Sequence, residues 1–132
     1  MKYRLMDLLA CPICKHFPLE LHVFETRRIT EELRTQKCEL YCGYLSRWLE
    51  EMMLGEKPPC EECWRIEIVN GIIFCESCGR WYPIIDEIPR LLPDNIRKAQ
   101  MKREELAFLK KHADKLPDKI TKEGKPYNLR EG

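Results

Sequence analysis

The sequence predicts an α+β fold in which a small antiparallel sheet carries a metal site, with a helical insertion and a C-terminal helix attached. Two observations lead to this prediction. The pairs Cys11/Cys14 and Cys75/Cys78 each place two thiols in one tight turn, beside segments whose apolar and polar residues alternate as in half-buried strands. Between the pairs, and again after the second pair, apolar residues recur at helical spacing.

Residues 1–25 and 64–93 are expected to form the metal-binding domain. Asn70-Gly71 predicts a hairpin turn within it, because both residues tolerate a positive φ. Prolines in the last two extended segments predict a place at the edge of the sheet. The expected elements are, in chain order, a short helix over 3–9, strands over 19–23, 64–69 and 72–74, and extended segments over 81–85 and 88–93.

The rest of the chain divides into a helical insertion over residues 26–63 and a C-terminal helix with a polar tail over residues 94–132. In the insertion, the apolar residues of segment 40–53 have helical spacing. In the C-terminal region, a loosely helical pattern covers residues 95–116. The tail that follows is polar and has no periodicity, so its position is left open.

Charge and hydropathy exclude several classes of protein. The 132 residues include 23 Lys and Arg against 22 Asp and Glu, a net charge of +1, which argues against a general nucleic-acid coat. The lysines between Lys98 and Lys125 are interleaved with acidic residues, which favours a solvated face over a contact with RNA. The apolar start is too short for a signal sequence, and no apolar run approaches the roughly 20 residues that span a bilayer. A cytoplasmic location is therefore expected.

The four outer cysteines, Cys11, Cys14, Cys75 and Cys78, predict a structural zinc site of the zinc-ribbon type. In a reducing compartment such pairs indicate metal ligands before disulfides. Four thiolates complete the tetrahedral shell of Zn²⁺ and leave no position for a catalytic water. Gly79 supports the second turn, since it lets the backbone aim N–H groups at the sulfurs. A redox function of Cys11/Cys14 would require a βαβ context, which the sequence lacks.

The inner cysteines, Cys38, Cys42, Cys60 and Cys63, are open to three interpretations. The first is a second four-thiolate zinc site that fixes the end of the insertion. The second is a pair of disulfides, and the third is a set of buried thiols in a core.

The chain is not expected to be an enzyme. It has no phosphate-binding glycine loop, no nucleophile motif and no convincing pair of carboxylates. It does have a crowded apolar segment after the second cysteine pair, and a small domain cannot bury that segment from both sides. Either the insertion or a partner covers these residues, and an edge strand with apolar neighbours suits strand addition by a partner. The residues concerned are Trp81, Ile84, Ile85, Ile88, Leu91 and Leu92.

Two stretches resemble a known family. Residues 5–15 (LMDLLACPICK) and 74–93 (FCESCGRWYPIIDEIPRLLP) are similar to the signatures of the zinc-ribbon activator subunit shared by several S-adenosylmethionine-dependent methyltransferases. The chain departs from many members at Asp86-Glu87, where they have Asp-Gly, and the inner cysteines and the tail after Leu92 have no clear counterpart.

The resemblance implies a non-catalytic subunit that forms a heterodimer with methyltransferases acting on tRNA, rRNA or a translation release factor. It implies zinc ligation by the outer cysteines, and a zipper of main-chain hydrogen bonds near residues 85–92, Pro89 included. S-adenosylmethionine would bind only the partner, and any contact with tRNA would be indirect. The alternative is a zinc-ribbon module that binds nucleic acid by itself, with an affinity that falls steeply with salt.

Overall fold

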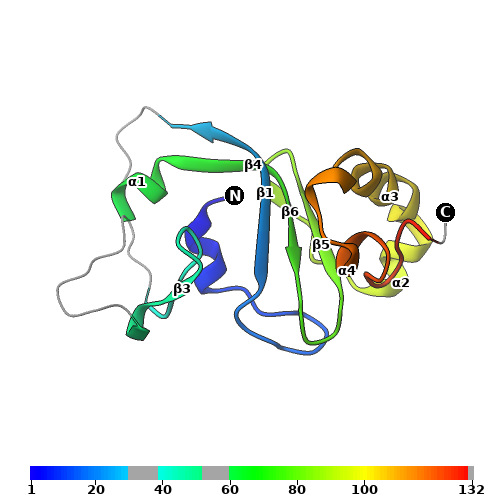
Figure 1. The fold of residues 1–132 in the computed structure, drawn as a ribbon, viewed down its shortest axis with the longest axis horizontal. Coiled ribbons are helices and arrows are strands. Elements are labelled where there is room, and N and C mark those ends of the chain that lie inside the picture. The colour runs from blue at the N-terminus through cyan, green and yellow to red at the C-terminus, as the bar shows by residue number, and fades with distance from the viewer. Residues whose placement is uncertain (30–38, 52–59, 131–132) are drawn as a thin grey trace.

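A four-stranded antiparallel sheet with the order β1-β4-β5-β6 forms the centre of the protein (Figure 1). The computed structural model describes residues 1–29, 39–51 and 60–130. The predicted α+β fold with a small antiparallel sheet and a C-terminal helix is confirmed. The strands are β1 (Glu20–Arg28), β2 (Tyr41–Cys42), β3 (Arg47–Trp48), β4 (Ile66–Phe74), β5 (Trp81–Ile85) and β6 (Ile88–Pro89), and β2 pairs with β3 in a separate sheet.

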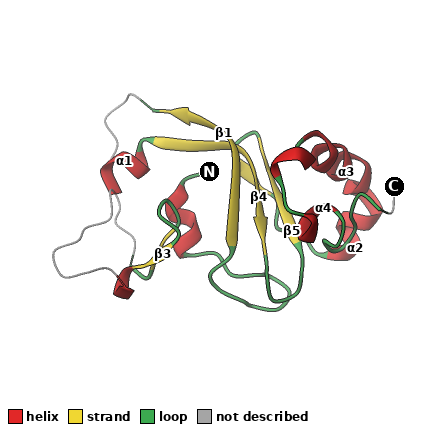
Figure 2. Cartoon of the chain, in the orientation of Figure 1, coloured by secondary structure: helices red, strands yellow, loops and turns green. Residues whose placement is uncertain are grey.

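Short helices lie on both sides of the sheet (Figure 2). Among the described residues, no helix has the length and apolar character needed to span a membrane. The 3-10 helices are η1 (Tyr3–Asp7), η2 (Leu49–Glu51) and η4 (Ala113–Lys115), and η3 (Arg97–Met101) is a π-helix. The α-helices are α1 (Cys60–Trp64), α2 (Asp94–Ile96), α3 (Lys102–Lys111) and α4 (Asp118–Thr121).

The two faces of the sheet carry separate hydrophobic cores, because successive side chains of a strand point to opposite sides. Ile73, Tyr82 and Ile84 face the first core, which also contains Met6 of η1 and Tyr41 of β2. The second core lies under the C-terminal helices. Its buried members are Ile72, Phe74, Trp81, Leu109, Ile120 and Tyr127.

The hairpin predicted at Asn70-Gly71 is wrong, because β4 runs straight through both residues. Gly71 instead allows a close approach between strands, since a Cβ there would lie 2.6 Å from the backbone oxygen of His22. The pairing of β1 with β4 shifts register at this point, between Val23 and Glu25. The Asn-Gly signal therefore marks an irregularity in a long strand.

The edge position predicted for both proline-containing segments holds for β6 but not for β5, which lies between β4 and β6. Pro83 is tolerated in β5 because its carbonyl accepts the Arg90 N–H on the β6 side, at a distance of 2.9 Å. The side of Pro83 that lacks a donor therefore faces the short strand β6, and the pairing with β4 is not interrupted.

The helix predicted over residues 40–53 is also wrong for its described part, which forms β2, β3 and η2. The Asp7 carboxylate accepts hydrogen bonds from the N–H groups of Glu39, Leu40 and Tyr41 at 2.6–2.9 Å and fixes the bend that leads into β2. Ser46 has a positive φ of 55° in the turn that follows. The apolar side chains of this hairpin pack on other segments instead of one another along a helix. Residues 52–53 of the predicted helix lie outside the described residues.

The C-terminal region, defined here as residues 94–130, packs against the sheet on the Trp81 side. A run of helical elements covers 94–115, as predicted from the sequence. The polar tail also docks: Trp81 Nε1 donates to the Tyr127 carbonyl at 2.9 Å, and the Trp81 N–H donates to Lys125. The tail thus joins the second core.

Candidate metal centre

Two tight turns with the same backbone geometry hold the outer cysteines. In the first turn, Cys11 accepts the Lys15 N–H and donates its own N–H to His16. In the second, Cys75 accepts the Gly79 N–H and donates to Arg80. All four hydrogen bonds measure 2.8–2.9 Å.

The fourth residue after the first cysteine has a positive φ in both turns, 68° at Lys15 and 78° at Gly79. Glycine adopts this conformation without strain, so Gly79 was recognisable from the sequence. Lys15 performs the same role and was missed. Its position, four residues after Cys11, was the available signal.

The two turns bring Cys11, Cys14, Cys75 and Cys78 together, with all four Sγ atoms within 4.8 Å of one another. The Cys14 and Cys75 sulfurs are 3.4 Å apart, and those of Cys11 and Cys78 are 3.7 Å apart. A tetrahedral ZnS₄ centre with bonds of about 2.3 Å has sulfur–sulfur edges of about 3.8 Å. The four cysteines therefore fit a Zn²⁺ ion with only small adjustments.

The electrostatics of the cluster also suit a cation. Burial opposes ionisation of Cys11. Hydrogen bonds to its thiolate outweigh this effect and lower the pKa of Cys11 to about 6; the donors are the Cys14 N–H, the Tyr82 hydroxyl and the Ile13 N–H. Burial and the adjacent thiols of Cys14 and Cys78 raise the pKa of Cys75 to about 12. Four neighbouring thiolates repel one another, and a divalent cation is what allows all of them to ionise.

Residues outside the cluster contact the sulfurs. The Tyr82 hydroxyl lies 3.3 Å from Cys11 Sγ, a distance at which it donates to a thiolate. Arg80 is held by a two-point ion pair with Asp94 and lies within reach of Cys78, and both partners raise the pKa of its guanidinium. Sequence reasoning did not identify these supporting residues. Asp94 belongs to the C-terminal region, which therefore contributes to the surroundings of the metal site.

The inner cysteines are only partly visible. The structure buries Cys42 in β2 and Cys63 in α1, and Cys42 carries a free thiol. Elements β2 and α1 both contact η1. Cys38 and the side chain of Cys60 lie outside the described residues.

The residues expected to bind a partner separate into three groups, which are fully buried, exposed and half-buried. Trp81 and Ile84 are fully buried within the chain itself, so they offer no surface to a partner in this structure. The C-terminal region supplies the cover of Trp81, which the sequence had assigned to the insertion or a partner. Ile88 is 62% exposed. The half-buried members of the group are Ile85, Pro89, Leu91 and Leu92.

The geometry of the cysteine turns agrees with a comparison of the sequence to known families. The sequence model of the Trm112p-like protein family matches residues 2–87, which include all four outer cysteines. The chain belongs to the Trm112p-like family. The Trm112p-like proteins are methyltransferase activators and are not themselves catalytic, as the resemblance of the cysteine signatures implied. No curated protein matches the chain. The Trm112p-like match ends before β6 and does not include the C-terminal region.

Proposed function

We propose that this protein is the non-catalytic subunit of a heterodimer with S-adenosylmethionine-dependent methyltransferases that act on tRNA, rRNA or a translation release factor. The subunit keeps its partner folded and active, while the partner binds S-adenosylmethionine. The contact is the outer edge of β6 and the apolar side chains beside it. The exposed Ile88 at this edge is the observation that supports this surface most directly.

Strand β6 has a backbone edge suited to pairing with another chain. Among the described residues it is the last strand of the sheet, with β5 on one side only. The Arg90 N–H points inward to Pro83, so the backbone groups of the next residue, Leu91, point outward in an extended chain. No backbone hydrogen bond of the Leu91 N–H occurs within the described part of the protein. A strand added here would gain main-chain hydrogen bonds.

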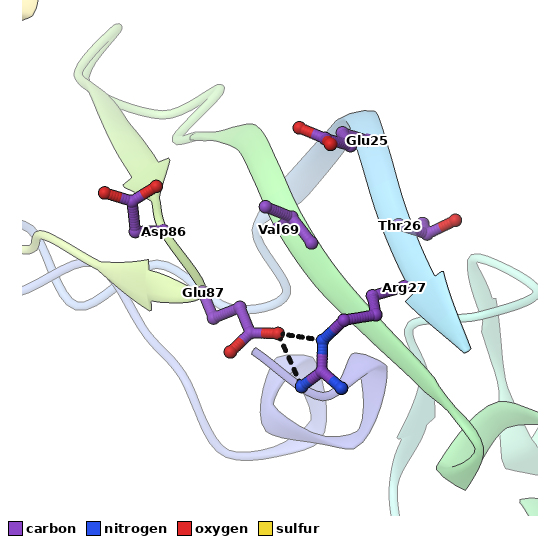
Figure 3. A pocket seen from close by; sticks show the side chains of 6 residues that line it. All are labelled: Glu25, Thr26, Arg27, Val69, Asp86 and Glu87. Carbon is purple, nitrogen blue, oxygen red and sulfur yellow. Dashed lines mark hydrogen bonds and ion pairs between the residues drawn. The ribbon is translucent and has the colours of Figure 1, made fainter. Parts of the chain in front are cut away.

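The turn between β5 and β6 is fixed from two sides. Asp86 and Glu87 have φ values of 50° and 72°, as in a type I′ turn, so the departure from Asp-Gly preserves the backbone conformation. Figure 3 shows Arg27 reaching from β1 to Glu87 across an open pocket of about 420 Å³, and Arg27 lies 2.8 Å from the Glu87 carboxylate. The Glu87 carbonyl also accepts a hydrogen bond from the Met1 ammonium. A preorganised edge reduces the entropy lost on binding.

Apolar burial would add to the strand pairing. Ile88 exposes a large aliphatic side chain, and Leu91 packs partly on the first core. Burying one aliphatic side chain of this size contributes about 1.5–3 kcal/mol. Leu8 provides a matched comparison, since it is equally exposed, at 62%, but lies beyond η1 and not on the β6 edge.

Affinity capture tests the proposal. The zinc-loaded full chain is used as bait in a lysate of its source, and captured methyltransferases are identified and purified. We expect Ile88→Asp to weaken binding to the purified methyltransferase by at least about tenfold, because a charge would be buried in the contact. Leu8→Asp serves as the control and should leave binding unchanged. Equal binding by wild type and Ile88→Asp would show that the interface lies elsewhere.

A further inference from the structure

The C-terminal region differs in charge from the rest of the protein. Residues 94–130 contain eleven Lys or Arg against six Asp or Glu, a formal charge of +5. Residues 1–93 contain twelve Lys or Arg against fifteen Asp or Glu, a formal charge of −3, and Glu131 adds the remaining −1. The overall balance of +1 therefore hides a segregation between two parts of the fold. The interleaving of lysines with acids in the sequence, which favoured a solvated face, does not by itself show which of these charges are paired in the fold.

The fold places three of the six acidic side chains of the C-terminal region in ion pairs with arginines. Glu105 is fully buried against Arg97 at 2.8 Å. Asp94 binds Arg80, and Glu104 binds Arg90 at 3.1 Å, so both acids are neutralised by arginines from residues 1–93. Glu104 and Glu105 thus bind arginines and do not neutralise the lysines of residues 97–111, whereas Asp118, farther along the chain, pairs with Lys122 at 3.4 Å.

The cations of the same helical run remain on the surface. The segment over residues 97–111 is about 20 Å long, at 1.5 Å per residue. Arg103 and Lys110 are seven residues apart in α3 and share one face, turned away from the buried Leu109. The exposed cations of the run form no ion pair within the described part of the chain; they are Lys98, Lys102, Arg103, Lys110 and Lys111.

We propose that the exposed cations of this helical run bind the phosphate backbone of RNA, with Arg103 and Lys110 as the pair that shares one face; the set of Lys98, Lys102, Arg103, Lys110 and Lys111 is called the basic helix surface. The inference rests on the proposed function, in which the partner acts on RNA, and adds a direct contact by this chain. Arg90, which follows β6, is tied to Glu104 of α3. RNA on the basic helix surface would therefore lie beside the edge proposed for the methyltransferase.

The make-up of the surface favours RNA over an acidic protein. Stable protein interfaces depend on large apolar or aromatic anchors in pockets. The exposed residues between the cations are small or polar, namely Ala99, Gln100, Ala107 and Glu104, whose charge is paired with Arg90. None of the large exposed apolar side chains of the described chain belongs to residues 94–130. Phosphate contacts require only accessible cations, and they carry no sequence information.

Fluorescence anisotropy of the zinc-loaded full chain with a labelled tRNA transcript, over a salt series, tests the inference. We expect binding that weakens linearly on a log–log plot. Arg103→Gln/Lys110→Gln should weaken it about tenfold at low salt and reduce the slope by about 2, because two phosphate contacts are lost. The control Arg28→Gln/Arg65→Gln removes the same charge from two exposed arginines of the sheet region and should change binding less than about twofold.

Three results would overturn the inference: no binding of the tRNA by wild type at the lowest salt, an equal loss in the control, or an unchanged slope in Arg103→Gln/Lys110→Gln. The first is the outcome expected if an acidic protein is the true ligand.

Methyltransferase capture separates this test from that of the proposed function. Capture should survive Arg103→Gln/Lys110→Gln, whereas loss of capture would place the enzyme itself on α3 and contradict the RNA assignment. The anisotropy assay uses the chain without a methyltransferase. It therefore still tests RNA binding if Ile88→Asp leaves methyltransferase capture intact and the β6 interface is wrong.

Discussion

One face of the sheet packs on segments inside the Trm112p-like match, and the other packs on the C-terminal region outside it. The first face is built around the cysteine cluster, with Cys11 and Cys75 as buried members of its core. The second face has no such cluster among its described residues. It is held by aromatic packing and a buried ion pair between Arg97 and Glu105.

The difference between the two faces shows how a small zinc-ribbon sheet gains a second packed layer, which here is the C-terminal region. Trp81 lies opposite Phe74 on the second face, and Tyr127, Leu109 and Ile120 cover this surface. A β-sheet presents alternate side chains on both faces, so the second face requires a cover from the same chain or from another protein. In this protein the C-terminal region supplies the cover and leaves β6 at one edge of the sheet, with β1 at the other.

Removal of the metal should produce the largest effect and should separate the two faces. We expect Cys75→Ser to destabilise the protein by at least about 4 kcal/mol, because structural zinc sites supply about 10 kcal/mol or more of folding free energy. Hydrogen exchange should show loss of protection in β5 and η1 before loss in α3. Ser77→Ala, in the same turn, is the control and should keep its metal. Equal loss of protection in α3 would show that both faces unfold as one unit.

Metal quantification on the same samples also decides the state of the inner cysteines. About two Zn²⁺ per wild-type chain, with about one retained in Cys75→Ser, would support a second site formed by Cys38, Cys42, Cys60 and Cys63. About one Zn²⁺ per wild-type chain would contradict a second site.

Breaking the buried ion pair should have the next largest effect, confined to the second face. Arg97 and Glu105 are both 0% exposed, and the Arg97 guanidinium lies 5.0–5.5 Å from the ring centres of Trp81, Tyr82 and Tyr127. We expect Arg97→Met to cost about 3–5 kcal/mol in urea denaturation, because Glu105 would be left as an unpaired buried charge.

The double variant Arg97→Met/Glu105→Leu provides the matched control for the ion pair. It removes both charges, so it should be less destabilised than Arg97→Met alone, although Tyr127 loses the acceptor of its 2.6 Å hydrogen bond to Glu105. A single variant as stable as wild type would mean that the ion pair does not hold the C-terminal region in place.

The sequence allowed prediction of features that depend on short spacing. Two residues between cysteines are enough to define a metal-binding turn, so the outer cluster was identified. The resemblance of the flanking residues led to the family. The alternation of apolar and polar residues over 19–23 indicated the strand that is β1, and the 95–116 pattern indicated a helical segment.

The features that were missed depend on contacts between distant segments. Asn70-Gly71 has the local chemistry of a turn. In the fold, however, the absence of a Cβ at Gly71 allows the backbone of His22 in β1 to approach closely. The helical spacing of residues 40–53 is overridden by hydrogen bonds that backbone N–H groups donate to Asp7, more than thirty residues earlier. Part of the cover of Trp81 comes from a polar tail whose large buried side chains, Ile120 and Tyr127, carry no periodic signal. Spacing within a segment cannot report such contacts.

The smallest of the expected effects concerns Asp7, which ties the insertion to η1 on the first face. Burial alone would raise the pKa of Asp7, but the N–H groups of Glu39, Tyr41 and Leu40 outweigh it and hold that pKa below its ordinary value of 3.8. A carboxyl whose pKa is depressed on folding stabilises the protein above its unfolded pKa, and this stability is lost as the pH falls through the folded pKa.

We therefore expect Asp7→Asn to cost about 2 kcal/mol at pH 7, the contribution of hydrogen bonds to a charged acceptor. The difference from wild type should shrink below about pH 4, where the wild-type carboxylate gains a proton. Asp114→Asn, at an exposed acid of the C-terminal region, is the control and should change stability little at either pH. Urea denaturation at pH 7 and pH 3 measures both variants. A pH-independent difference between wild type and Asp7→Asn would mean that the lost stability comes from packing, and that the charge of Asp7 does not anchor the insertion.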